Sequence, residues 1–248
     1  MNQSKKNKIV CIIPARYDST RLPGKPLKEI RGLPLIMWTY NRALKSGVFD
    51  EVYVATDDRQ ILHAVEKHGG SACMTMNRHV SGTDRVFELA QRIECEFVVN
   101  LQGDEPWLPI HVIKSFAAKV LDLDNLTLLT CVSNATIEDM NNPNVVKAVL
   151  DAHNYALYFS RASIPFFRND IVGGRYKHSG IYGFSKKGLE MFCNFPPGRL
   201  EKIEKLEQLR ALEYGMKILC LKKNYDSINI DTPEDLNKFR LFVDKIKN

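Results

Sequence analysis

The sequence lacks the patterns that mark several large classes of protein. No CxxC pair occurs among its six cysteines, and none of them stands at zinc-ligand spacing with a histidine. The apolar run 9–13 is too short for a signal-peptide core and far too short for a membrane span. A clustered basic stripe with interleaved aromatic residues, typical of nucleic-acid binding, is missing. We therefore expect a cytoplasmic protein with reduced thiols that binds neither nucleic acid nor membrane.

The signatures of several enzyme classes are missing as well. There is no GxSxG elbow and no Cys/His pair that would indicate a covalent nucleophile. The GxxxxGK[ST] loop of P-loop proteins and the GxGxxG fingerprint of dinucleotide-binding enzymes do not occur. The first apolar run is followed instead by Pro14-Ala15-Arg16. This disfavours a dinucleotide-dependent oxidoreductase, although such an enzyme would share the alternating fold described below.

The composition is that of an ordinary globular protein with a basic surplus. The chain has 248 residues, 44% of them hydrophobic and 26% charged. This length suits one large α/β domain, or one domain with a substantial insertion. The 35 lysines and arginines exceed the 29 acidic residues, so the formal net charge is +6. Such a surplus suits anionic small molecules.

Strand-like and helix-like segments alternate through the first half of the chain. We expect strands over 9–13, 51–56, 72–75 and 97–101, and helices over 34–46, 58–68 and 83–92. Such alternation implies right-handed crossovers and a mostly parallel central sheet. Ligands in these sheets bind beyond the carboxyl ends of the strands. The polar segments expected at those ends are 14–25, 57–58, 81–85 and 102–104.

The pattern changes in the second half. Segments 145–150, 155–160 and 177–184 indicate antiparallel strands, which we interpret as an insertion that completes the substrate site. Helix 199–214, strands 217–221 and 227–230 and a final helix from Thr232 follow. We predict one domain over 1–248. It comprises a nucleotide-binding half at about 8–125, an insertion at about 126–198, and a return to the main sheet at about 199–248.

The loop after the first strand carries three cations within ten residues, Arg16, Arg21 and Lys25. Fixed cations and loop amides suit a triphosphate, whose charge they neutralise and whose leaving pyrophosphate they stabilise. A solvated basic loop is the alternative. The position at a strand's carboxyl end favours the phosphate site.

Two acids, Asp104 and Asp231, each follow an apolar segment. Mg²⁺ binds one or two protein carboxylates and fills its other positions with phosphate oxygens and water. Each acid can equally cap a helix, and for Asp231 that reading is strong because Thr232-Pro233 follow at once. From the residues alone both roles stay open.

Eight stretches, in order and spanning nearly the whole chain, resemble the 3-deoxy-manno-octulosonate cytidylyltransferase (CMP-Kdo synthetase) family. They are IIPARYDSTRLPGKPL, ATDD, SGTDRV, NLQGDEP, YALYFSRASIP, KHSGIYGF, LEKIEKLEQLRALEYG and IDTPEDL. The resemblance implies a Rossmann-like nucleotidyltransferase fold, with the insertion serving sugar binding and dimerisation. It also implies a homodimeric, Mg²⁺-dependent enzyme of lipopolysaccharide synthesis. That enzyme couples CTP to 3-deoxy-manno-octulosonate (Kdo) and gives CMP-Kdo and pyrophosphate.

The resemblance also implies roles for individual residues. Arg16, Arg21, Lys25, Asp104 and Asp231 would be catalytic, and the two aspartates would bind the metal. The expected CTP contacts are Pro14, Ala15, Arg16, Arg21, Lys25, Ser81, Gly82, Arg85 and Gln102. The expected sugar contacts are Gln102, Arg161, His178, Tyr182, Glu207 and Gln208.

Without the resemblance, most of these later residues have simpler explanations. His178 alone would be a surface or core histidine, and Glu207 and Gln208 would lie on a solvated or dimer-facing helix. Two other functions stay open: the same reaction on 8-amino-3,8-dideoxy-manno-octulosonate, and a catalytically degenerate nucleotide-binding regulator. The segments YKHSGIY, PPGRLEKIEKLEQLRALEYG and YDSINIDTPEDL look closer to the amino-sugar branch, and Ser179 and Asn229 depart from the pattern common in the Kdo branch. A sialic-acid cytidylyltransferase fits the motifs less well.

Overall fold

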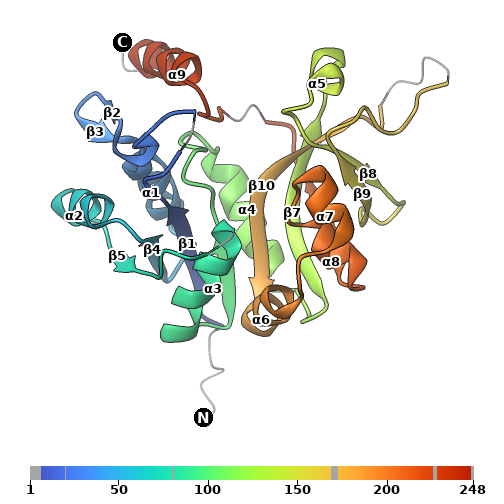
Figure 1. Ribbon diagram of the computed structural model, residues 1–248, viewed down its shortest axis with the longest axis horizontal. Coiled ribbons are helices and arrows are strands. Elements are labelled where there is room, and N and C mark those ends of the chain that lie inside the picture. Colours follow the sequence, from blue (N-terminus) through green and yellow to red (C-terminus); the bar gives the residue numbers. More distant parts are fainter. Residues whose placement is uncertain (1–6, 20, 80, 169–172, 226–227, 247–248) are drawn as a thin grey trace. The chain divides into compact units, whose positions relative to one another are not determined.

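The computed structural model of the chain describes residues 7–19, 21–79, 81–168, 173–225 and 228–246 (Figure 1). The chain forms two compact units, the first comprising Met1–Ala117 with Asp226–Asn248 and the second Ala118–Tyr225. Of the segment 199–248, residues 199–225 belong to the second unit, where strand β11 (Lys217–Lys222) pairs in parallel with β7 (Thr127–Asn134), and the described residues from 228 onwards belong to the first.

The first unit is built on parallel strands. Its strands pair in the order β6 (Phe97–Asn100), β1 (Ile9–Ala15), β4 (Glu51–Thr56), β5 (Ala72–Met74), as part of a sheet that has nine strands among the described residues. Residues 10–13 of the central strand are completely buried. A strand covered on both faces carries a continuous apolar run instead of an alternating one, which is why the sequence predicts it correctly.

Helices connect these strands and begin at capping residues. Asp58 accepts hydrogen bonds from the backbone N–H groups of Gln60 and Ile61 at the start of α2. Ser81 caps α3 (Gly82–Arg92) and forms a capping box with Asp84, so this helix begins one residue before the predicted range 83–92. The helices of this unit are α1 (Leu35–Ser46), α2 (Arg59–Lys67), α3 (Gly82–Arg92), α4 (Ile110–Val120) and α9 (Pro233–Ile246). The last residues of α4 belong to the second unit. A 3₁₀ turn, η1 (Lys25–Leu27), and a hairpin of β2 (Glu29–Ile30) and β3 (Leu33–Pro34) precede α1.

The segment that returns to the first unit differs from its prediction. Residues 228–230 form no strand, and the rest of the predicted strand lies outside the described residues. The segment is instead held by one backbone hydrogen bond, from Ile230 N–H to the carbonyl oxygen of Asp104 at 3.0 Å. This bond brings the two acids singled out from the sequence to one place.

The second unit is a mixed sheet with short helices. Strand β10 (Tyr176–Ser185) is antiparallel to β7 and to β8 (Lys147–Leu150), and β8 is antiparallel to β9 (Ala156–Ser160), which confirms the predicted antiparallel segments. The predicted helix 199–214 is two helices, because Lys205 adopts a left-handed conformation (φ 55°) that ends the first. The helices are α5 (Ile137–Asn141), α6 (Lys186–Asn194), α7 (Arg199–Glu204) and α8 (Leu209–Glu213). None of the helices in the described part of the chain is long and apolar enough to cross a bilayer.

Candidate active site

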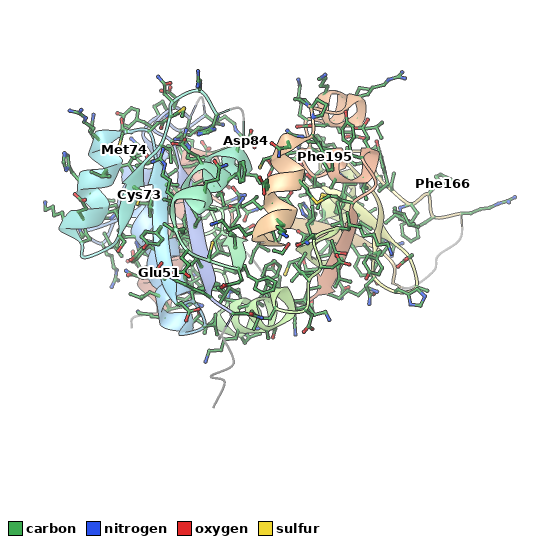
Figure 2. The ribbon with its side chains drawn as sticks, turned by 90° about the horizontal axis from the view of Figure 1, so that it is seen from below. Glu51, Cys73, Met74, Asp84, Phe166 and Phe195 are labelled. Carbon is green, nitrogen blue, oxygen red and sulfur yellow. The ribbon has the colours of Figure 1, made fainter. Side chains whose placement is uncertain are left out.

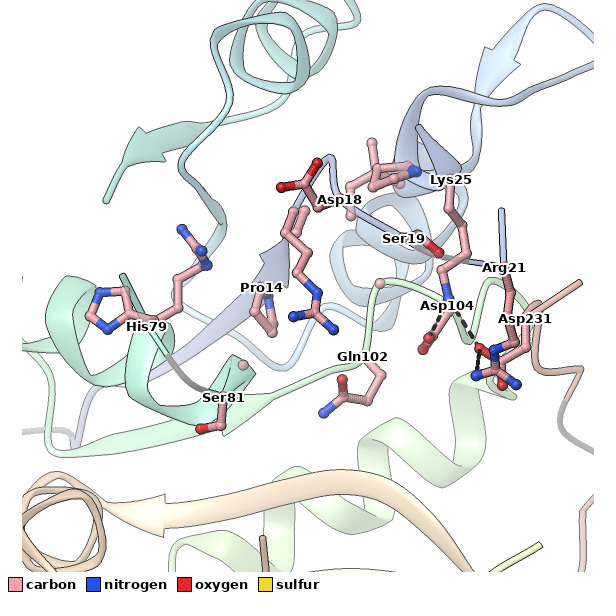
Figure 3. A pocket seen from close by; sticks show the side chains of 17 residues that line it. Pro14, Asp18, Ser19, Arg21, Lys25, His79, Ser81, Gln102, Asp104 and Asp231 are labelled. Atoms are coloured by element: carbon pink, nitrogen blue, oxygen red, sulfur yellow. Dashed lines mark hydrogen bonds and ion pairs between the residues drawn. The ribbon is translucent and has the colours of Figure 1, made fainter. Parts of the chain in front are cut away.

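A cavity of about 350 Å³ lies in the first unit, beyond the carboxyl ends of β1 and β6 (Figure 3). Its wall comes from the loop after β1, the start of α3, the loop after β6 and the returning segment. The lining residues are Pro14, Ala15, Arg16, Asp18, Ser19, Arg21, Lys25, Pro26, Ile36, His79, Ser81, Gly82, Arg85, Gln102, Gly103, Asp104 and Asp231. Because parallel strands end at one edge, residues far apart in the chain meet here.

Lys25 holds the two acidic residues of this cavity together. Its Nζ atom lies 2.8 Å from Oδ2 of Asp104 and 3.3 Å from Oδ1 of Asp231, and it donates to the carbonyl oxygen of Ile230 at 2.9 Å (Figure 3). The Lys25 side chain is only 15% exposed. One ammonium group therefore contacts both carboxylates, in a partly desolvated position where such pairs are stronger than at a free surface.

The other two cations of the loop are less constrained. Arg21 is 57% exposed, and its Nη2 lies 3.2 Å from Oδ1 of Asp231. Arg16 also lines the cavity and makes no hydrogen bond or ion pair with the residues that the structure describes. Arg16 is thus a cation whose charge remains available to an anionic ligand.

Asp231 is not the cap of the last helix. Thr232 has that role, because its hydroxyl oxygen accepts a hydrogen bond from Asp235 N–H at 3.2 Å. The Asp235 carboxylate in turn accepts hydrogen bonds from the backbone N–H groups of Asp231 and Thr232. The Asp231 carboxylate is therefore directed to Lys25 and Arg21, and the alternative left open by the sequence is removed.

Two glycines allow the strand ends to come together around the cavity. A Cβ atom on Gly103 would lie 3.0 Å from Cδ1 of Ile36 and 3.3 Å from the carbonyl oxygen of Pro14. A Cβ atom on Gly82, at the start of α3, would lie 3.2 Å from Cγ of Pro14. A side chain at either position would push the loop after β6 or the N-terminus of α3 away from β1.

Arg85 forms part of the cavity wall, and its charge is already engaged. The residue is 4% exposed, and its guanidinium group donates to Asp57 Oδ2 at 2.8 Å, to the Thr75 hydroxyl at 2.5 Å and to the Met76 carbonyl at 3.2 Å. It therefore joins the end of β4 to the loop after β5. Next to it, Nε2 of His79 contacts the Glu88 carboxylate, which also accepts from Met76 N–H at 2.9 Å.

A second group of predicted residues lies within the second unit. The Tyr182 hydroxyl group and Oε1 of Gln208 are hydrogen-bonded at 3.1 Å. Nε2 of Gln208 is buried and has no hydrogen-bond partner among the described residues. The His178 ring packs edge-on against Phe159 and beside Tyr182, at centroid distances of 4.9 and 5.6 Å. Burial lowers the pKa of His178 to about 3, because desolvation disfavours the imidazolium cation.

Arg161 is fixed by backbone carbonyl groups. Its Nε donates to the carbonyl oxygen of Glu204 at 3.0 Å and its Nη1 to that of Pro143 at 3.2 Å. The Glu204 carboxylate is occupied by the Ser160 hydroxyl at 2.6 Å and by Arg161 N–H at 3.0 Å. The guanidinium group is therefore oriented by neutral carbonyl groups and keeps its positive charge for a ligand.

Comparison with known proteins identifies the family. The family model described as cytidylyltransferase matches residues 10–218. A 3-deoxy-manno-octulosonate cytidylyltransferase of Thermodesulfovibrio yellowstonii is 47% identical, over 92% of this chain and 94% of that relative. The chain belongs to the 3-deoxy-manno-octulosonate cytidylyltransferase family. A relative with the same name from Geobacter sulfurreducens is 45% identical, over 93% of this chain and 97% of its own.

Solved structures agree with this assignment. The structure of a CMP:2-keto-3-deoxy-manno-octonic acid synthetase complexed with CTP has a TM-score of 0.92 and 38% identity, over 96% of this chain and 99% of that one. A nucleotidyl transferase from Methanothermobacter thermautotroptrophicus has a TM-score of 0.67 at 14% identity, over 97% of this chain and 99% of that one. The second likeness shows only that the fold is that of a nucleotidyltransferase, with a mostly parallel Rossmann-like sheet as expected.

The structure brings most of the predicted site residues of this cytidylyltransferase together. Every residue predicted to contact CTP or metal lines the cavity of the first unit. Gln102 lies there too, whereas the other predicted sugar contacts lie in the second unit. Sequence reasoning missed Asp18 and His79 in the lining, and Asp57 behind Arg85. Asp57 follows a predicted strand, and that position could have indicated its role.

Proposed function

We propose that this chain transfers the cytidylyl group of CTP to Kdo and releases pyrophosphate. The observation that carries the proposal is the cavity in which Lys25 contacts both Asp104 and Asp231 while Arg16 and Arg21 line the same wall. The substrates, CTP and Kdo, are taken from the names of the similar proteins, which are a synthetase in complex with CTP and Kdo cytidylyltransferases. Transfer of a phosphoryl-type group requires positioning and charge stabilisation, and needs no nucleophilic side chain.

The cations of the first loop have distinct tasks in this proposal. Arg16, which has no partner among the described residues, binds the triphosphate directly. Arg21 exchanges its exposed contact with Asp231 for a phosphate oxygen. Lys25 contacts both carboxylates and orients them. Its ammonium group is thereby held in a fixed position, from which it stabilises the negative charge of the leaving pyrophosphate.

We include Mg²⁺ in the proposal, because the residues present fit it. The lining contains three carboxylates, Asp18, Asp104 and Asp231, and four cationic side chains, Arg16, Arg21, Lys25 and Arg85. The surplus is one positive charge, so the lining alone cannot balance the negative charge of a triphosphate. No group of three metal-ligating side chains occurs among the described residues. Two carboxylates are nonetheless what Mg²⁺ takes when phosphate oxygens complete its shell, and Asp104 and Asp231 are that pair. When bound, the ion would neutralise phosphate charge and lower the pKa of the attacking hydroxyl group.

The residues of the second unit provide the sugar contacts. Arg161 offers a charged guanidinium group suited to the sugar carboxylate, and Gln208 offers a buried amide N–H without an acceptor. Tyr182 orients that amide through its oxygen. An acidic, polyhydroxylated sugar matches this set of one cation and several neutral hydrogen-bonding groups.

Pyrophosphate release measures the proposed reaction directly. With CTP and Mg²⁺, we expect rapid release with Kdo, and slower release with 8-amino-3,8-dideoxy-manno-octulosonate and N-acetylneuraminate. Faster turnover of the amino sugar would move the assignment to that branch. A folded protein that binds CTP and releases no pyrophosphate with any of the three sugars would be the catalytically degenerate regulator instead.

We also propose that the chain is a homodimer whose interface lies on the second unit. Several large apolar side chains of this unit face solvent, with exposures of 61% for Leu157, 66% for Ile203 and 89% for Phe166, which Figure 2 shows on an outlying segment. A second copy is the partner that would bury them. Light scattering should give the mass of a dimer and, for Ile203→Glu, of a monomer. Leu44→Glu, which changes a residue of the first unit that is 57% exposed, should stay dimeric.

A cytoplasmic location and a role in lipopolysaccharide synthesis complete the proposal. Each cysteine of the chain is a thiol and not half of a disulfide, as is typical of proteins in a reducing compartment. Cell fractionation with an antibody against the chain tests the location. Depletion of the protein should lower the Kdo content of the outer membrane and raise free Kdo.

A further inference from the structure

Thr130 and His178 form a contact whose hydrogen-bond polarity is set by the backbone around it. Thr130 lies on β7 and His178 on the antiparallel strand β10, and the pairing register shifts between Ser179 and Tyr182. At this bulge the Thr130 hydroxyl oxygen lies 3.1 Å from the carbonyl oxygen of Ser179 and 2.8 Å from that of Ile181. The same oxygen lies 2.8 Å from Nε2 of His178.

Counting protons decides which group donates. A threonine hydroxyl group has one proton, and a carbonyl oxygen can only accept. If Thr130 donated to His178, its oxygen would face two carbonyl oxygens without a proton between them. The hydroxyl proton therefore points to a carbonyl group of the bulge, and Nε2–H of His178 donates to the Thr130 oxygen.

The other ring nitrogen of His178 is then an acceptor. Burial against Phe159 and Tyr182 keeps the ring neutral at physiological pH, so that only one nitrogen carries a proton. Because that proton is on Nε2, Nδ1 has a bare lone pair, and it has no hydrogen-bond partner in the described part of the chain. The residue as a whole is partly exposed.

We propose that Thr130 is a positioning residue that fixes His178 as its Nε2–H tautomer, so that Nδ1 of His178 accepts a hydrogen bond from a hydroxyl group of the sugar. The assignment of the ligand rests on the proposed function, whereas the tautomer rests on the geometry alone. A bare nitrogen lone pair attracts a hydroxyl or ammonium proton and repels carboxylate and carbonyl oxygens. His178 therefore selects the polyol part of the sugar and leaves the carboxylate to a cation such as Arg161.

The tautomer can be measured without substrate. Protein labelled with ¹⁵N in its histidines gives correlation spectra in which protonated and bare ring nitrogens have well-separated shifts, and His178→Gln assigns the signal. We expect Nε2 protonated and Nδ1 bare from pH 5 to 8. Thr130→Val should abolish this preference, because both tautomers then lack an acceptor, and Thr130→Ser should retain it. A proton on Nδ1 in the unaltered protein overturns the proposal.

Steady-state kinetics test the role in binding. Thr130→Val should raise KM for the sugar about tenfold, the loss expected for one misdirected hydrogen bond, and leave KM for CTP within about twofold. Thr130→Ser keeps the hydroxyl group and should have the same KM for the sugar as the unaltered protein. Thr127→Val, the same change elsewhere on the buried strand β7, serves as control and should change neither constant.

Sugar analogues that each lack one hydroxyl group identify the donor. With the unaltered protein, one analogue should have a KM about tenfold higher than the complete sugar. With Thr130→Val, the same analogue and the complete sugar should have equal KM values, since the contact is then already lost. Additive losses for every analogue, or a CTP KM that rises with the sugar KM, overturn the role in sugar binding. If the unaltered protein turns over no sugar, the proposed function fails and the ligand assignment with it, while the NMR result still decides the tautomer.

Discussion

The residue clusters of the two units have opposite physical character. In the first unit, Lys25, Arg16 and Arg21 and the carboxylates of Asp104 and Asp231 are charged and partly open to water. In the second unit, a neutral histidine and a buried amide dominate, with Arg161 oriented by carbonyl groups. The first arrangement suits a polyanion whose charge must be balanced, and the second suits a polyol whose hydroxyl groups must be distinguished.

The difference follows from the cost of burying charge. Opposite charges that remain near water keep part of their solvation and can exchange partners, as a phosphate site requires. A buried neutral hydrogen-bonding group discriminates more sharply, because a wrong ligand leaves it unpaired at a cost of about 1–3 kcal/mol. Under the proposed function, charge therefore provides binding strength in one unit and hydrogen-bond geometry provides selectivity in the other.

Removal of Lys25 should have the largest effect. Lys25→Met leaves two carboxylates facing each other without their shared ammonium group and removes positive charge from the phosphate site. We expect kcat/KM for CTP to fall about a thousandfold, roughly 4 kcal/mol in transition-state stabilisation. Lys28→Met, on the same loop but outside the cavity lining, is the matched control. Its kcat/KM for CTP should remain within about threefold of that of the unaltered protein. Equal activity of the two variants would show that the charged cluster is not the reaction site.

The metal proposal predicts the next largest effect. Asp231→Asn should lower turnover about a hundredfold at limiting Mg²⁺, with partial recovery at high Mg²⁺, because one carboxylate ligand becomes neutral. Its melting temperature should change little, since Thr232 caps α9. Thr232→Ala should do the reverse and cost about 1 kcal/mol of stability. Near-normal turnover of Asp231→Asn at limiting Mg²⁺ would contradict the metal role.

The division between the units predicts a smaller, selective effect for Gln208. Gln208→Ala removes the buried amide without an acceptor and should raise KM for the sugar about tenfold while leaving KM for CTP unchanged. Arg21→Ala should show the opposite selectivity. If both variants change the same constant, the proposed separation of nucleotide and sugar recognition is wrong.

The pH dependence of stability tests the neutral histidine. The pKa of His178 falls from 6.5 to about 3 on folding, so between these values the unfolded chain binds a proton that the folded chain does not. Stability should therefore fall with decreasing pH in this window, by about 1.4 kcal/mol per pH unit from this residue. The free energy of unfolding of His178→Gln, measured with denaturant, should lack this pH-dependent contribution. As the pH falls, the unaltered protein should therefore lose stability relative to the variant. An unchanged difference between pH 6 and 4 would mean that His178 is not buried as a neutral ring.

Prediction from the sequence succeeded where one local signal was sufficient. The buried run 9–13 and the start of α9 next to Thr232-Pro233 each follow from a short pattern. It failed at Lys205, whose left-handed conformation divides the predicted helix 199–214, since no glycine or proline marks the break. The position of residues 199–225 in the second unit depends on the pairing of β11 with β7, which are distant in the sequence, so no local pattern shows it.

The sequence by itself determined which chemical groups the site can contain and at which strand ends they lie, because apolar runs and loop composition are local properties. Only the tertiary structure decided which groups meet. Asp104 and Asp231 are far apart in the chain and become neighbours through one backbone hydrogen bond and one ammonium group. The protonation of His178 likewise depends on a bulge that places two carbonyl oxygens beside Thr130, and hydrogen-bond direction is a property of three-dimensional arrangement.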